Sequence, residues 1–152
     1  MATLFNNDLP EIEIRFKNKV RPSDLRKIGA SRDIFEVAQA VFNADTIEYT
    51  EEFIVFYLNR ANKVLGWVKI SAGGLTGTVA DTRVIFSVGL KAAATSLILS
   101  HNHPSGNFAP SNEDKLLTQK AVQAGKLLDI KVLDHIIITP ENYFSFADEG
   151  LI

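Results

Sequence analysis

The chain has 152 residues, of which 46% are hydrophobic and 22% are charged, and its formal net charge is −2. This composition is typical of one soluble globular domain, and the charge excludes a generally basic surface for nucleic acid or anionic membranes. The absence of cysteine excludes disulfides and thiolate metal sites. The chain has neither a signal-peptide pattern nor 18 consecutive apolar residues. We therefore expect a cytoplasmic protein without a membrane partner.

Residues 1–45 are predicted to form an N-terminal extension that contains a short strand and a helix. Alternating apolar and polar residues over 11–16 fit an edge strand. Apolar residues at helical spacing over 31–43 fit an amphipathic helix that begins at a cap formed by Ser31 or Asp33.

A basic stretch lies inside this extension. Against one acid, Asp24, it holds the basic residues Arg15, Lys17, Lys19, Arg21, Arg26, Lys27 and Arg32. Such a stretch can contact phosphate groups, so nucleic acid is a candidate partner. However, its charges are spread along the segment rather than gathered in a dense block, which favours an ordinary solvated surface.

Residues 46–152 are predicted to form a unit in which strands and helices alternate. The expected elements are strands at 51–59, 64–71, 95–100, 130–138 and 143–147 and helices at 81–94 and 111–129. The first two strands are joined by a short polar turn and are expected to pair as a hairpin. A glycine-rich segment, 72–77, lacks the spacing and the lysine of a phosphate loop and predicts a turn or bulge. This order predicts an α/β (mixed α+β) domain with a central mixed sheet flanked by helices.

One polar segment, LILSHNHPSGNFAPSNEDKLL (97–117), interrupts the apolar pattern between a buried strand and a helix. His101 and His103 are two residues apart, so their imidazoles project the same way from an extended chain. Asp114 follows in the first turn of the helix. Two imidazoles and one carboxylate leave the fourth position of a tetrahedral zinc ion open to water, as in catalytic rather than structural zinc sites.

Parts of this segment also have plainer explanations. Ser111 and Asp114 have the spacing of a helix capping box, which alone accounts for both residues. A His-x-His pair by itself is usually polar surface. Both patterns together, in a loop stiffened by Pro104 and Pro110, favour a metal site, and capping and metal binding can coexist at one helix start.

The segment HNHPSGNFAPSNED fits the pattern His-x-His-x7-Ser-x2-Asp and resembles the JAMM motif of metalloproteases with a JAB/MPN domain. Together with LDIKVLDHIII and SFADEG, it is similar to the RadC family, so residues 46–152 are interpreted as a RadC-like JAB/MPN domain. The resemblance implies a single domain related to the cytidine-deaminase-like sandwich.

The resemblance also implies roles for individual residues. The two histidines and the aspartate of the motif imply that His101, His103 and Asp114 hold one Zn²⁺ per chain. The motif serine corresponds to Ser111, which would bind the oxyanion or orient the water. The family base is an upstream glutamate, and its spacing Glu-x-Phe selects Glu51 as the catalytic base, with the adjacent Glu52 as the alternative.

His135, in LDHIII, matches a further family position and could lie near the site. A buried histidine that is bonded within the sheet is the plainer explanation, so His135 is left out of the predicted ligand set.

The activity implied by the resemblance is zinc-dependent hydrolysis of peptide or isopeptide bonds by a metal-activated water, with a peptide or protein as substrate. The alternative is a non-catalytic metal-binding module, or a DNA-repair-associated interaction module of the same family. RadC proteins typically carry a helix-hairpin-helix region ahead of this domain. Residues 1–45 lack its paired glycine hairpins, which weakens the DNA alternative.

Overall fold

The structure is a computed structural model that describes residues 10, 12–13, 15–16, 19–73 and 79–152. Its helices are α1 (Ser31–Val41), α2 (Thr82–Lys91) and α3 (Asn112–Leu128), together with a short 3-10 helix, η1 (Pro22–Asp24). Its strands are β1 (Glu52–Leu58), β2 (Val64–Ala72), β3 (Ser96–Asn102), β4 (Lys131–Ile138) and β5 (Tyr143–Ser145). No helix among these residues has both the length and the apolar composition needed to cross a membrane.

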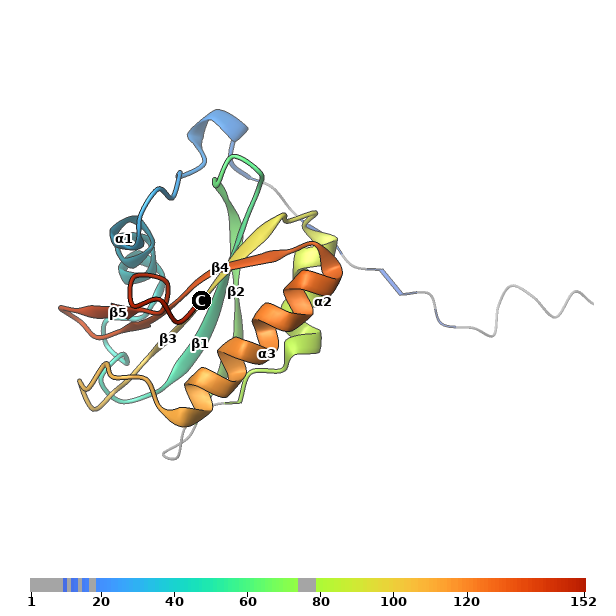
Figure 1. The fold of residues 1–152 in the computed structure, drawn as a ribbon. Helices are drawn as coiled ribbons and strands as arrows, with labels where there is room; N and C mark the ends of the chain where they lie inside the picture. Colours follow the sequence, from blue (N-terminus) through green and yellow to red (C-terminus); the bar gives the residue numbers. More distant parts are fainter. Residues whose placement is uncertain (1–9, 11, 14, 17–18, 74–78) are drawn as a thin grey trace, which may run out of the picture.

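The strands of the described chain form one mixed sheet in the order β2-β1-β3-β4-β5 (Figure 1). β3 and β4 are parallel, and the other neighbouring pairs are antiparallel. Parallel neighbours need a long crossover connection, which α3 supplies between β3 and β4. The expected hairpin is present as β1 and β2.

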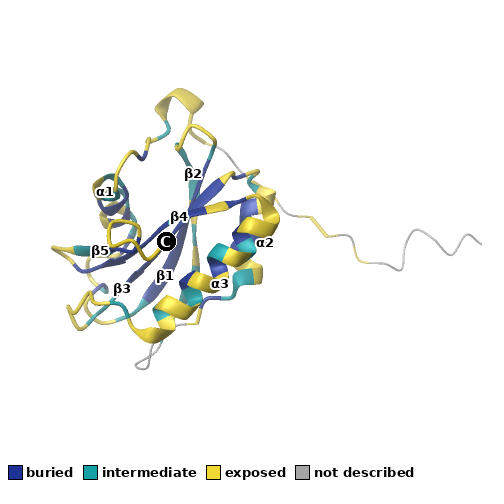
Figure 2. Ribbon diagram, in the orientation of Figure 1, coloured by how far each residue is buried: buried dark blue, intermediate teal, exposed yellow. Residues whose placement is uncertain are grey.

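Helices cover both faces of the sheet, which explains why its central strands are buried throughout. α1 packs on one face, and α2 and α3 pack on the other (Figure 1). Every residue of β1 and β3 is buried (Figure 2). Alternate side chains of β1 pack into hydrophobic cores on opposite faces of the sheet. Ile54 and Phe56 lie on the face covered by α1, and Phe53 and Val55 lie on the opposite face. The predicted mixed sheet flanked by helices is confirmed.

The first helix, α1, contributes its buried residues to the same core as β1. Its start differs from the expectation, because Ala30 rather than Ser31 is the N-cap. Asp33 does accept a hydrogen bond from the Ala30 N–H, at 3.0 Å. Ser31 is already helical, and its hydroxyl contacts Tyr143 and Asp148 from the C-terminal segment. The division of the chain after residue 45 stays a prediction.

Other boundaries differ from the expectation by a few residues. β3 continues to Asn102, beyond its expected end, so His101 lies inside the strand. The expected strand at 11–16 includes residues 11 and 14, which lie outside the described residues, and the described residues of that segment form no strand. Most of the expected turn at 72–77 also lies outside the described residues.

Gly125 lies where α3 passes close to the start of β4. A Cβ atom at this position would stand 2.3 Å from the carbonyl oxygen of Ile130. Alanine is normally favoured over glycine in a helix by about 1 kcal/mol. Because the overlap here is with backbone, Gly125→Ala is instead expected to lower the free energy of unfolding by roughly 1–3 kcal/mol, as measured by urea denaturation.

Gly66→Ala in β2 is the control for this prediction, because the nearest atom to its added Cβ would be a side-chain carbon of Phe16 at 3.8 Å. An equal loss of stability in both variants would contradict the explanation from the close approach.

Candidate metal centre

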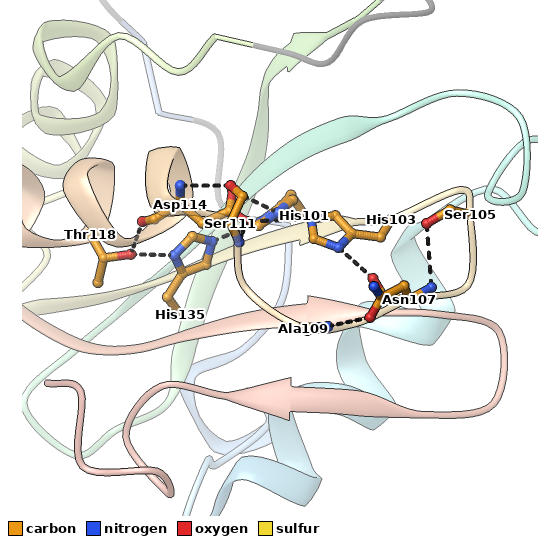
Figure 3. Close-up of polar contacts among 9 residues, drawn as sticks. All are labelled: His101, His103, Ser105, Asn107, Ala109, Ser111, Asp114, Thr118 and His135. Carbon is orange, nitrogen blue, oxygen red and sulfur yellow. Dashed lines mark hydrogen bonds and ion pairs between the residues drawn. The ribbon is translucent and has the colours of Figure 1, made fainter.

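The candidate site lies at the edge of the sheet where β3 ends and both β1 and α3 begin. β1 and β3 are antiparallel neighbours, so the start of β1 lies beside the end of β3, with Phe53 paired to His101. The chain that leaves β3 turns through a loop and enters α3 within ten residues. Figure 3 shows His101, His103 and Asp114 drawn together by this path.

His101 and His103 point their Nε2 atoms at each other, at a distance of 2.9 Å. The side chain of His101 is 1% exposed and that of His103 is 18% exposed, so the pair is largely withdrawn from water. Nδ1 of His103 lies 2.6 Å from the carbonyl oxygen of Asn107. Since a carbonyl oxygen only accepts, Nδ1 of His103 carries a proton, and in the neutral ring Nε2 keeps its lone pair.

Asp114 completes a triangle with the two imidazoles. Its Oδ1 lies 3.2 Å from His101 Nε2, and its Oδ2 lies 3.4 Å from His103 Nε2. The start of α3 fixes this carboxylate, because Asp114 Oδ2 accepts from the Ser111 N–H while Ser111 Oγ accepts from the Asp114 N–H. The capping box expected from the sequence is therefore present, and it positions a predicted ligand.

The carboxylate and the imidazoles change one another's protonation. Burial by itself raises the pKa of Asp114, but the close contacts of its carboxylate with the imidazoles of His101 and His103 outweigh this effect and hold this pKa well below its usual range. The hydrogen bond with Asp114 raises the pKa of His103, against the opposing effect of burial. The site thus keeps an ionised carboxylate beside two imidazoles, an arrangement that favours a bound cation.

These three side chains fit a metal ion. Ligand atoms that each lie about 2.0–2.1 Å from a tetrahedral zinc ion are roughly 3.3 Å apart. The corresponding contacts here are 2.9, 3.2 and 3.4 Å. The Nε2 lone pair of His103 and the negatively charged carboxylate of Asp114 point towards the same position. This arrangement is unfavourable unless a proton or a metal cation lies between them. Two nitrogens and one carboxylate suit Zn²⁺ and several other divalent ions.

The adjacent glutamates at the start of β1 have different surroundings. A carboxylate oxygen of Glu51 and ring nitrogens of His101 and His103 all lie within 4.8 Å of one another. Glu52 instead forms an ion pair with Lys69, with 2.6 Å between Oε1 and Nζ, and its side chain is only 10% exposed. The structure therefore brings Glu51, rather than Glu52, to the two histidines.

Asn102, between the two histidines, holds the segment that carries Glu51. Its side chain is buried, and its Oδ1 accepts from the Glu52 N–H at 2.7 Å. Its Nδ2 donates to the carbonyl oxygens of Ile47 and Thr50. This role was not predicted from the sequence. Strand alternation could have placed Asn102 on the face opposite to His101, but its partners are about fifty residues away along the chain.

His135 lies beside the site without being placed as a ligand. It is fully buried, and its Nε2 lies 2.8 Å from His101 Nδ1. Its Nδ1 lies 2.6 Å from Oγ1 of Thr118, a residue that no sequence pattern singled out. Both ring nitrogens are thus engaged inside the protein, which agrees with a buried histidine bonded within the fold.

Ser111→Ala is expected to destabilise the start of α3, because it removes the acceptor for the Asp114 N–H. Loss of an N-cap serine costs about 1 kcal/mol of stability, and the less restrained carboxylate is expected to bind zinc more weakly. Urea denaturation and a zinc competition titration measure the two effects. Ser105→Ala alters another exposed serine of the same loop, and equal behaviour of the two variants would contradict the role of the capping box.

The chain is similar to known proteins over most of its length. A family model described as RadC-like JAB domain matches residues 28–151. A UPF0758 protein of Flavobacterium johnsoniae is 47% identical over 127 residues, which cover 84% of this chain and 54% of the relative. A UPF0758 protein of Chlorobaculum parvum is 37% identical over 139 residues, which cover 91% of this chain and 60% of the relative. The chain therefore spans little more than half the length of these relatives.

Proposed function

The chain belongs to the RadC-like JAB domain family, and from this premise we propose that it is a zinc-dependent hydrolase of peptide or isopeptide bonds. One observation carries the proposal: the Nε2 atoms of His101 and His103 and the carboxylate of Asp114 lie within 3.4 Å of one another. Three protein ligands are typical of catalytic zinc sites, whereas structural sites are closed by four.

His101, His103 and Asp114 would hold the metal ion. A bound Zn²⁺ supplies Lewis-acid chemistry, in that it acidifies a water molecule and polarises a carbonyl group. The capping box at the start of α3 keeps Asp114 oriented towards the imidazoles. Burial of His101 in β3 keeps that imidazole away from bulk water.

Glu51 is the proposed general base and general acid. Its carboxylate takes a proton from the attacking water as the water oxygen bonds to the carbonyl carbon of the substrate. It then gives this proton to the amide nitrogen as the C–N bond breaks, and the second proton of the water stays on the new carboxyl group, so the products are a carboxylic acid and an amine. The distance of at most 4.8 Å from the histidine nitrogens supports this role, because it places Glu51 within reach of a reacting group held there.

Ser111 is proposed to donate a hydrogen bond to the oxyanion that develops on the substrate carbonyl. Its Oγ accepts from the Asp114 N–H, and a hydroxyl group has one proton of its own to donate. In well-placed sites such a donor contributes about 3 kcal/mol to transition-state stabilisation.

Hydrolysis in ¹⁸O-labelled water tests the proposal. The zinc-loaded protein is incubated with a peptide mixture from a digested proteome and, separately, with isopeptide-linked peptides. Mass spectrometry is expected to find ¹⁸O in newly formed carboxylates, and chelation of the zinc is expected to abolish this product. Stoichiometric zinc binding without any labelled product would instead favour the non-catalytic metal-binding module.

A further inference from the structure

A buried row of hydrogen bonds connects His101 to the backbone of α3. The carbonyl oxygen of Asp114 lies 2.6 Å from Thr118 Oγ1, which in turn lies 2.6 Å from His135 Nδ1. His135 Nε2 then lies 2.8 Å from His101 Nδ1. Figure 3 shows this row, which runs from the first turns of α3 through His135 to His101. The proposed reaction assigns no role to Thr118 or His135.

The positions of the protons follow from the α3 end of the row. A carbonyl oxygen only accepts hydrogen bonds, so the single hydroxyl proton of Thr118 must point to the carbonyl of Asp114. With this proton committed, Thr118 Oγ1 can only accept in its contact with His135. Nδ1 of His135 therefore carries a proton.

His135 in turn determines where His101 carries its proton. The ring of His135 is fully buried, stacks on Phe146 at a centroid distance of 4.8 Å, and lies 5.6 Å from the ring of Phe53. These apolar surroundings favour the neutral imidazole, whose only ring proton is on Nδ1. Nε2 of His135 must then accept from Nδ1 of His101, which leaves the lone pair of His101 on Nε2.

We propose that Thr118 and His135 are positioning residues that hold His101 in the tautomer able to bind a metal ion. This role rests on the proposed metal site and not on hydrolysis. For His103, the backbone carbonyl of Asn107 accepts the Nδ1 proton and fixes the tautomer directly. The tautomer of His101 is instead fixed through two side chains, those of His135 and Thr118. Partner groups of this kind orient ligand histidines, and their loss typically lowers metal affinity about 10–100-fold.

Thr118→Val is the sharpest test, because valine keeps the shape of threonine but offers no acceptor to His135 Nδ1. The proton of His135 is then better placed on Nε2, where it donates to Nδ1 of His101. His101 would carry its own proton on Nε2, the nitrogen that has to bind the metal. We expect the zinc affinity of Thr118→Val to fall about 10–100-fold. Thr118→Ser keeps the hydroxyl and is expected to keep most of the affinity.

Two measurements on each variant check this expectation. Competition with a chromophoric chelator gives the zinc dissociation constant, and ¹⁵N NMR of the metal-free protein reports which ring nitrogen of His101 is protonated. The proton is expected on Nδ1 in the wild-type protein and in Thr118→Ser, and on Nε2 in Thr118→Val. Wild-type zinc affinity together with an unchanged tautomer in Thr118→Val would overturn the proposal.

These results are distinguishable from failure of the proposed function. If the wild-type protein binds zinc but hydrolyses nothing, a weaker zinc affinity and a changed His101 tautomer in Thr118→Val still support the positioning role. If Thr118→Val does not fold, His135→Gln and His135→Leu replace it. The glutamine amide offers an acceptor to His101 and a donor to Thr118, whereas leucine offers neither. Tighter zinc binding by the glutamine variant supports the proposal, and equal binding overturns it.

Discussion

Glu51→Gln is expected to retain bound zinc and to lose hydrolysis, with a turnover rate lower by about 10²–10⁴-fold. Glutamine has nearly the same shape as glutamate, but it can neither take a proton from the attacking water nor return one to the departing amine. The three predicted metal ligands are unchanged in this variant. Metal analysis and the ¹⁸O assay, performed on the same preparation, measure retention and loss together.

Glu52→Gln is the matched control, because it makes the same chemical change at the next residue. Glu52 pairs with Lys69, so this variant is expected to lose some stability while it keeps its hydrolytic activity. If Glu52→Gln abolished hydrolysis and Glu51→Gln did not, the assignment of the general base would pass to Glu52.

His103→Ala is expected to abolish stoichiometric zinc binding while the fold is retained. The substitution removes one of three predicted ligands and leaves only His101 and Asp114. His103 is the better choice for this test because its side chain is partly exposed and follows the end of β3, whereas His101 is buried within the strand. Loss of zinc from this variant can therefore be separated from loss of the fold.

The thermal unfolding midpoint with and without added zinc measures this effect. Free zinc at 100 times the dissociation constant stabilises a native protein by about 2.7 kcal/mol. For a protein of this size, each kcal/mol raises the midpoint by roughly 2–4 °C. The wild-type midpoint is therefore expected to rise by several degrees, and that of His103→Ala to stay unchanged.

Asn107→Ala is the control for His103→Ala, because it alters the same loop but keeps the backbone carbonyl that contacts His103. It is expected to respond to zinc as the wild-type protein does. An equal rise of the midpoint in His103→Ala would refute the predicted ligand set.

Much of the fold was predictable because the signals that specify it are local. The apolar run at 53–58 predicted a strand covered on both faces, and β1 is buried at every position. Apolar residues at helical spacing after Ser111 predicted the helix that the structure shows as α3. Such periodicity reflects which sides of an element are buried. The pattern of apolar residues in the sequence therefore matches the pattern of burial in the folded chain.

The capping box could be recognised for the same reason, and the prediction of the metal ligands rests on an equally local signal. His101, His103 and Asp114 lie within one short segment, and Ser111 is three residues from Asp114. The path from β3 through the loop into α3 brings them together with little dependence on the rest of the chain. A motif confined to one connection between two elements carries most of its geometry in its own spacing.

The sequence by itself therefore determined the family and the mixed α/β architecture, and it predicted a metal-ligand set. Only the tertiary structure decided which groups surround that set. Pairing between β1 and β3 brings Glu51 towards the histidines and leaves Glu52 with Lys69. The parallel pairing of β3 with β4 places His135 behind His101. These partners come from strands and helices that are distant along the chain, and strand register depends on packing of the whole sheet rather than on any local pattern.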